Sequence, residues 1–161
     1  MALVEQLAPR FVSAVDAWLK TGSAILVPMP TSAASWRQRG FNLPQLLARK
    51  VSRESRHLIE VADCLLFART VGDQRRLSAN DRASNLRDSM AARPDVVEAQ
   101  VERFRAAGHE PQILLIDDVI TTGATMAEAN RALAAGGIHI DGFLVFAETL
   151  LKTPTQIAKW V

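Results

Sequence analysis

The run from Ile113 to Thr125, ILLIDDVITTGAT, constrains the fold of this chain more than any other feature. Its leading apolar residues predict a strand that is buried on both faces of a sheet. Asp117 and Asp118 follow at the predicted end of this strand, and the small, hydroxyl-rich loop Thr121–Thr125 then opens a helix. Because ligands of open α/β sheets bind outside the carboxyl ends of the strands, the run predicts a binding site at this turn.

The two halves of the turn suit two groups of one ligand. Backbone N–H groups at the start of a helix, with Thr hydroxyls beside them, can hold a phosphate. Two adjacent carboxylates can bind hydroxyl groups or help to hold a metal. The combination indicates a sugar phosphate. A plain buried strand followed by a turn would explain Ile113–Ile116, but it would leave the acid pair and the loop unexplained.

Other phosphate chemistries also place acids after an apolar strand. Phosphatases of the haloacid-dehalogenase type require Asp-x-Asp-x-Thr, and Val119 stands where the second Asp is needed. Response-regulator receivers carry an acidic pair after their first strand and a phospho-acceptor Asp after a third strand, far downstream. Here the pair lies near the C-terminus, so both alternatives fit the sequence poorly.

The length of 161 residues fits a single domain with a hydrophobic core. The one cysteine, Cys64, excludes a disulfide framework and a cysteine-based zinc site, and we expect it to be a small apolar residue of a strand. We see no signal peptide and no apolar run long enough to cross a bilayer. A cytoplasmic protein without membrane insertion is therefore expected.

The net charge of +2 conceals an uneven distribution. Residues 37–93 contain twelve Lys or Arg and six Asp or Glu, whereas acids are in excess over the rest of the chain. Such a concentration favours an anionic partner, either a polyphosphate, a nucleic acid or a membrane surface. Solvated helix faces explain Arg49, Lys50, Arg53 and Arg56 equally well. Aromatic residues are sparse in this segment, so a base-stacking surface is poorly supported.

Helical and extended patterns alternate along the chain. Apolar residues at helical spacing predict helices over about 3–20, 42–56, 96–107 and 124–135, with a short helix over 153–160. Short apolar runs predict strands over 24–27, 63–68, 90–93, 113–117 and 140–147. Residues 31–39 are predicted to form a polar loop, and 70–88 a mobile, arginine-rich loop. Strands alternating with helices favour a parallel sheet.

Further motifs accompany the acid pair. The first predicted strand ends in Val27-Pro-Met-Pro30, and RGFN follows at residues 39–42. The segment 69–85 contains RTVGDQ, then LS, then RASN. Together with DDVITTGAT, these stretches resemble the ComF family of type I phosphoribosyltransferase-like proteins. The resemblance covers residues 24–147.

The resemblance implies a type I phosphoribosyltransferase fold, with a mainly parallel five-stranded sheet flanked by helices and a small hood or flexible loop. One domain is expected over residues 1–161. The ligand implied is phosphoribosyl pyrophosphate (PRPP). The acids Asp117 and Asp118 would hold its ribose hydroxyls. The loop that would hold its 5′-phosphate comprises Thr121, Thr122, Gly123, Ala124 and Thr125.

Two further groups of residues are implied by the same resemblance. The loop after the first strand would receive the pyrophosphate of PRPP through exposed backbone N–H groups, hydroxyls and cations; its candidates are Met29, Pro30, Thr31, Ser32, Arg37 and Arg39. A flexible loop would close over the same anion and exclude water; its candidates are Arg69, Gln74, Arg75, Arg82 and Asn85. We also expect a cis or otherwise unusual peptide within 28–32.

The activity implied is that of a Mg²⁺-dependent phosphoribosyltransferase, which transfers ribose 5-phosphate from PRPP to an unknown, nucleobase-like acceptor and releases pyrophosphate. Mg²⁺ would be held mainly by PRPP oxygens and water, with Asp117 and Asp118 nearby. The alternative is a non-catalytic accessory protein in competence. Its partners would be single-stranded DNA and helicase or recombination factors. A second copy of the chain is a further candidate partner.

The chain departs from the family pattern in three ways. The sequence does not include the usual N-terminal four-cysteine zinc module of the family, which is either naturally missing or removed by truncation. Thr31-Ser-Ala-Ala-Ser35 replaces a more basic stretch in the predicted pyrophosphate loop, and Leu43 follows RGFN where Gln is common. These departures weaken the prediction of tight pyrophosphate binding and of turnover more than the prediction of the fold.

Overall fold

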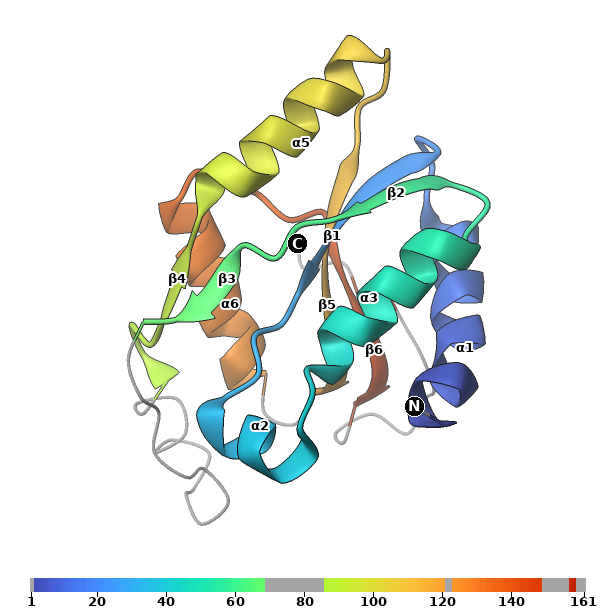
Figure 1. The fold of residues 1–161 in the computed structure, drawn as a ribbon. Coiled ribbons are helices and arrows are strands. Elements are labelled where there is room, and N and C mark those ends of the chain that lie inside the picture. The colour runs from blue at the N-terminus through green and yellow to red at the C-terminus, as the bar shows by residue number, and fades with distance from the viewer. Residues whose placement is uncertain (1, 69–85, 121–122, 149–156, 159–161) are drawn as a thin grey trace.

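Four parallel strands form the central sheet, in the order β2-β1-β5-β6 (Figure 1). Their bounds are Ser23–Pro28 for β1, Leu58–Val61 for β2, Gln112–Ile120 for β5 and Gly142–Glu148 for β6. The two-residue strand β7 (Ile157–Ala158) pairs antiparallel with β6. This computed structural model describes residues 2–68, 86–120, 123–148 and 157–158.

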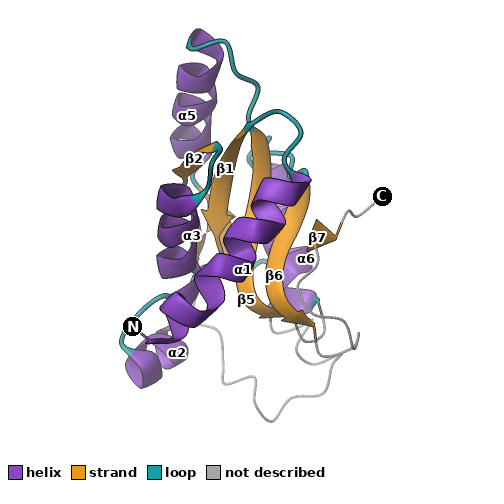
Figure 2. Ribbon diagram, turned by 90° about the vertical axis from the view of Figure 1, so that its right-hand side faces the viewer, coloured by secondary structure: helices purple, strands orange, loops and turns teal. Residues whose placement is uncertain are grey.

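Helices cover both faces of this sheet, as the sequence predicts (Figure 2). On one face lie α1 (Ala2–Trp18) and α3 (Leu43–Glu54), and on the other lie α5 (Pro94–Ala106) and α6 (Ala124–Ala135). The alternation of side chains along β1 serves both layers: Leu26 packs against α1 and α3, and Ile25 packs on the side of α5 and α6. A strand buried on both faces needs the apolar run seen in the sequence.

β1 and β5 are neighbouring central strands, paired in register from Ile25 opposite Ile113 to Pro28 opposite Ile116. Leu26, Leu114, Leu115 and Ile116 are fully buried. Each such side chain contributes about 1.5–3 kcal/mol through the hydrophobic effect. The buried parts of these two strands therefore anchor their carboxyl ends in the core.

A second, two-stranded sheet lies beside α6. It pairs β3 (Leu65–Phe67) with β4 (Met90–Ala92) in antiparallel fashion. Strands were predicted in both places, at 63–68 and 90–93, as members of one mainly parallel sheet. Their assignment to that sheet is wrong, because they pair with each other in a separate sheet. The edge strand β2 of the parallel sheet was not predicted. Of its four residues only Ile59 is buried, so this edge strand lacks the apolar run of the central ones.

Two other local predictions are wrong. The segment predicted as a polar loop over 31–39 contains a short helix, α2 (Ala33–Arg39), which begins after the cap residue Ser32. The predicted helix over 153–160 is a strand at Ile157–Ala158, where pairing with β6 determines the conformation; the rest of that range lies outside the described residues. No helix in the described part of the chain has the length and apolar character needed to span a membrane.

Candidate functional site

The acid pair lies within β5, close to its carboxyl end. The prediction ends this strand at Asp117, but the pairing with β6 continues to Ile120, opposite Glu148. Asp117 is paired with Val145 and is only 8% exposed, whereas the side chain of Asp118 is 23% exposed. Neighbouring residues of a strand point to opposite faces. The two carboxyl groups therefore have different environments although they are adjacent in sequence.

Asp117 is unusual in its ionisation. Burial raises its pKa well above the ordinary value, and hydrogen bonding to Asp118 and the negative charge of Asp118 raise it further. The backbone N–H of Asp118, which donates to Asp117 Oδ1 over 2.8 Å, and the more distant charge of Arg39 act in the opposite direction. Asp117 therefore retains its proton at a higher pH than an exposed aspartate does.

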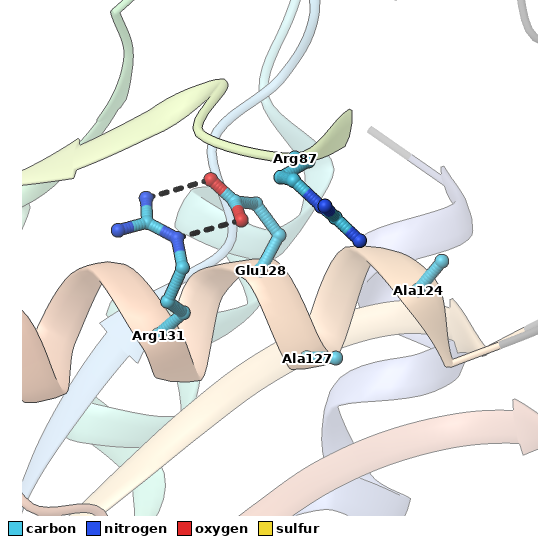
Figure 3. A pocket seen from close by; sticks show the side chains of 5 residues that line it. All are labelled: Arg87, Ala124, Ala127, Glu128 and Arg131. Atoms are coloured by element: carbon cyan, nitrogen blue, oxygen red, sulfur yellow. Dashed lines mark hydrogen bonds and ion pairs between the residues drawn. The ribbon is translucent and has the colours of Figure 1, made fainter. Parts of the chain in front are cut away.

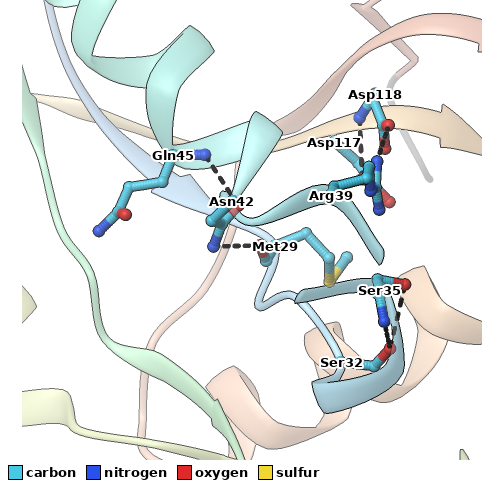
Figure 4. Close-up of polar contacts among 8 residues, drawn as sticks. All are labelled: Met29, Ser32, Ser35, Arg39, Asn42, Gln45, Asp117 and Asp118. Atoms are coloured by element: carbon cyan, nitrogen blue, oxygen red, sulfur yellow. Dashed lines mark hydrogen bonds and ion pairs between the residues drawn. The ribbon is translucent and has the colours of Figure 1, made fainter. Parts of the chain in front are cut away.

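Asp118 has a cationic partner from another element. Arg39 Nη1 donates to Asp118 Oδ2 over 3.1 Å, and the arginine side chain is 37% exposed (Figure 4). Arg39 is the last residue of α2. The helix ends there because Gly40 adopts a left-handed conformation, with φ 74°, and its N–H donates to Trp36 O over 2.7 Å. RGFN thus places an arginine against the acid pair.

The asparagine of RGFN fixes this connection. Asn42 caps α3 by accepting a hydrogen bond from the backbone N–H of Gln45 over 3.1 Å, and its amide donates to Met29 O over 3.4 Å (Figure 4). Met29 N in turn donates to Ile116 O over 2.9 Å. The first-strand loop, the start of α3 and β5 are therefore joined by successive hydrogen bonds. Asn42 was not among the predicted site residues; an Asn just before a helix with Pro44 in its first turn is the signal that predicts a cap.

The predicted pyrophosphate loop is partly occupied by structural contacts. The backbone N–H and C=O of Met29 are both used, and its side chain lies in the core on the side of α5 and α6. Ser32 Oγ caps α2, accepting from the Ser35 N–H over 3.2 Å. Pro30 and Thr31 are half-buried, and Arg37 is exposed. Residues 28–32 have no cis peptide bond and no positive φ, so the prediction of unusual backbone there is wrong.

The predicted phosphate loop is described from Gly123 onward. Gly123 precedes α6 with φ 73°, a left-handed conformation that other residues rarely adopt. Its carbonyl accepts from the Ala127 N–H over 2.9 Å, so α6 starts at Ala124 as predicted, with Thr125 in its first turn. Thr121 and Thr122 lie outside the described residues. So do Arg69, Gln74, Arg75, Arg82 and Asn85 of the predicted flexible loop.

A shallow hollow of about 230 Å³ lies along the first turns of α6 (Figure 3). Glu128 and Arg131 form an ion pair at 2.8 Å on its wall, and Glu128 also accepts from the Met90 N–H over 3.0 Å. Burial opposes ionisation of Glu128, but these partners outweigh it and lower its pKa. The cluster fastens β4 to α6. It was not predicted, because its residues carry no motif. The hollow is lined by Arg87, Ala124, Ala127, Glu128 and Arg131.

The described residues offer no enclosed metal site. None of their His, Cys, Asp and Glu side chains form a group of three or more that could hold a metal ion. Asp117 and Asp118 are two carboxylates, one of which is occupied by Arg39. This donor set suits Mg²⁺ held chiefly by ligand oxygens and water, and does not suit a metal bound by protein atoms alone.

Comparison with known proteins relates the chain to one associated with competence. It is 31% identical over 123 residues to a protein named competence protein F from Haemophilus influenzae. The alignment covers 75% of this chain and 48% of that protein, so the chain spans about half the length of the curated relative it matches. No protein-family model matches the chain. The match confirms the resemblance to the ComF family that the motifs predict.

Proposed function

Because the chain carries the ComF motifs and is related to competence protein F, we propose that it is a phosphoribosyltransferase-like protein that binds PRPP with Mg²⁺. The observation that carries the proposal is the position of Asp117 and Asp118 at the carboxyl end of a central parallel strand, followed by the glycine-initiated helix α6. Four parallel strands with helices on both faces support the type I phosphoribosyltransferase fold.

In this proposal the two acids have different roles toward the ribose. The Asp118 carboxylate is partly exposed and paired with Arg39, so in the complex it can accept hydrogen bonds from a sugar hydroxyl. Asp117 is buried, and burial raises its pKa in the free protein. Hydroxyl donors and a nearby cation stabilise its ionised form in the complex. The 5′-phosphate lies at the start of α6, where backbone N–H groups have no helical partner and the helix dipole favours an anion.

Bound Mg²⁺ supplies neutralisation of the negative charge that develops on the departing pyrophosphate. Asp117 and Asp118 are the residues that would hold it, together with PRPP oxygens and water. The protein itself positions the ribose and keeps its anomeric carbon accessible to an acceptor. Catalysis then rests on orientation and on electrostatic stabilisation of an oxocarbenium-like state. The acceptor proposed is nucleobase-like, and no residue is assigned as its general base.

Binding and turnover need separate tests. Calorimetry with PRPP and Mg²⁺ measures binding to the free protein. Release of pyrophosphate in the presence of a panel of nucleobases measures transfer. Saturable binding with pyrophosphate release supports the enzyme. The absence of PRPP binding to correctly folded protein would refute the proposal as a whole.

The second candidate is an accessory protein in competence that binds single-stranded DNA. Two observations favour it: the relative is named competence protein F, and residues 37–93 carry an excess of cations. If this candidate is correct, single-stranded DNA binds with an affinity that falls steeply with salt, since each neutralised phosphate releases counterions. PRPP binding without turnover, combined with such DNA binding, would favour the accessory over the enzyme.

A further inference from the structure

The Arg39–Asp118 ion pair connects the predicted pyrophosphate loop with the acid pair proposed to bind the ribose. We propose that Arg39 exchanges partners when ligand binds. In the free protein it neutralises Asp118. In the complex it turns to the diphosphate of PRPP, and the ribose hydroxyls replace it at Asp118. The exchange makes the protein prefer PRPP over free pyrophosphate. This preference rests on the proposed function.

The geometry allows the arginine side chain to move while the backbone stays fixed. The backbone around Arg39 is held on both sides, by the Ser32 cap at the start of α2 and by the contacts of Gly40 and Asn42 after it. The side chain itself is 37% exposed and reaches Asp118 through one N–H, at 3.1 Å. A paired arginine that is anchored at its backbone and exposed at its guanidinium can change partners without unfolding a helix.

The ion pair is also weak enough to exchange. Partly exposed ion pairs with one contact contribute about 0–1 kcal/mol, because solvent screens them and side-chain entropy opposes them. A phosphate group accepts two parallel N–H bonds from a guanidinium and carries more charge than a carboxylate. Arg39 therefore gains by moving to a diphosphate that lies near the carboxyl ends of β1 and β5.

The exchange removes the ion-pair partner of Asp118, and the ligand determines whether this loss is compensated. Asp118 lies beside Asp117, and among the described residues its ion-pair partner is Arg39. When PRPP binds, its ribose hydroxyls compensate Asp118 for the loss of Arg39. Free pyrophosphate has no such hydroxyls, so it leaves the carboxylate without a partner. The ion pair thereby opposes binding of pyrophosphate, which is the product of the proposed reaction.

A double-mutant cycle tests this exchange by calorimetry, with inorganic pyrophosphate in the absence of Mg²⁺ and PRPP in its presence as probes. The variants are Asp118→Asn, Arg39→Gln and both together. We expect Asp118→Asn to tighten pyrophosphate binding by about two- to fivefold, the value of the ion pair, while it weakens PRPP binding. In the Arg39→Gln background the same change leaves pyrophosphate affinity unaltered. Asp63→Asn is the matched control, since this exposed acid contacts Gln45 and lies outside the pair.

If Asp118→Asn tightened pyrophosphate binding by the same factor in the Arg39→Gln background, the exchange would be overturned. The effect would then come from the loss of a negative charge near the anion and not from the ion pair. No tightening in Asp118→Asn, with PRPP binding intact in the unaltered protein, would overturn the exchange and leave the proposed function standing. An intact pyrophosphate cycle in a protein that does not bind PRPP would show that the ion pair opposes pyrophosphate, but it would refute the preference for PRPP together with the proposed function. Thermal melts of each variant verify that the fold is retained.

Discussion

Asp117→Asn is expected to stabilise the protein while it impairs ligand binding. The wild-type carboxyl is 8% exposed and lies beside the like charge of Asp118, so its ionisation is unfavourable in the folded state. Asparagine has nearly the same shape and no charge. Its Oδ1 can still accept the Asp118 N–H, which donates over 2.8 Å, and its amide can donate to the Asp118 carboxylate. The variant thus resembles the protonated acid.

The sign of the pH dependence follows from the raised pKa. Below the pKa of an unfolded aspartate, about 3.9, both folded and unfolded states are protonated and Asp117 has no effect. Above it the folded state binds more protons than the unfolded state, so stability falls as the pH rises toward the raised pKa of folded Asp117. Asparagine removes this loss. The gain from Asp117→Asn is therefore smaller at pH 5 than at pH 8.

The magnitudes are within reach of ordinary assays. A single stabilising substitution, including one that removes an unfavourable charge, commonly yields about 0.5–2 kcal/mol, or about 1–8 °C in Tm for a chain of this size. Loss of one charge-assisted hydrogen bond to a ribose hydroxyl costs about 1.5–3 kcal/mol, which corresponds to about 10- to 150-fold in PRPP affinity. Calorimetric melts at pH 5 and pH 8 measure the first effect, and PRPP titration the second.

Asp118→Asn is the matched control for stability. Its carboxylate is 23% exposed and paired with Arg39, so its removal changes stability by about 0–1 kcal/mol. A lower Tm for Asp117→Asn at pH 8, or a gain that is equal at both pH values, would refute the assignment of an unfavourable buried charge to Asp117.

Three further predictions concern the surroundings of the acids. Gly123→Ala is expected to cost about 1–2 kcal/mol of stability, because Gly123 has φ 73°, and also to weaken PRPP binding. The control is Gly137→Ala, at φ 77° beyond the other end of α6, which introduces the same strain and should leave PRPP affinity unchanged. Thermal melts and PRPP titrations of both variants measure the two effects. Asn42→Ala removes the α3 cap and the bond to Met29 O, so urea unfolding should show a loss of about 1 kcal/mol and calorimetry a weaker PRPP complex. Burial raises the pKa of the Cys64 thiol to about 11, so a thiol reagent at pH 8 should leave Cys64 unmodified in native protein and modify it in urea; rapid native modification would contradict its burial.

The sequence predicts those parts of the structure that depend on strong local patterns. The apolar run before Asp117 predicts a central strand because burial on both faces requires one, and α6 begins and ends where the glycines on either side of it indicate. The edge strand β2 was missed because an edge strand needs little apolar surface. Helix α2 was missed because a short polar helix depends on its Ser32 cap and on Gly40, and apolar periodicity gives no sign of it.

The site shows a similar division. DDVITTGAT predicts which acids lie at the carboxyl end of the central strand, because the strand is followed by a helix at that point. That Arg39 pairs with Asp118, and that Asn42 joins α3 to Met29, depends on contacts between residues far apart in sequence. Such contacts follow from the tertiary arrangement of the chain, which no local pattern encodes. The different burial of Asp117 and Asp118 likewise follows from the continued pairing of β5 with β6.

Calorimetric titration of PRPP with Mg²⁺, into the unaltered protein and into the variant carrying both Asp117→Asn and Asp118→Asn, tests the central claim most directly. The account predicts saturable binding to the unaltered protein and none to the double variant, whose circular dichroism spectrum and melt show a retained fold. Equal PRPP affinity in the two proteins would contradict the assignment of the acid pair as the ribose-binding site.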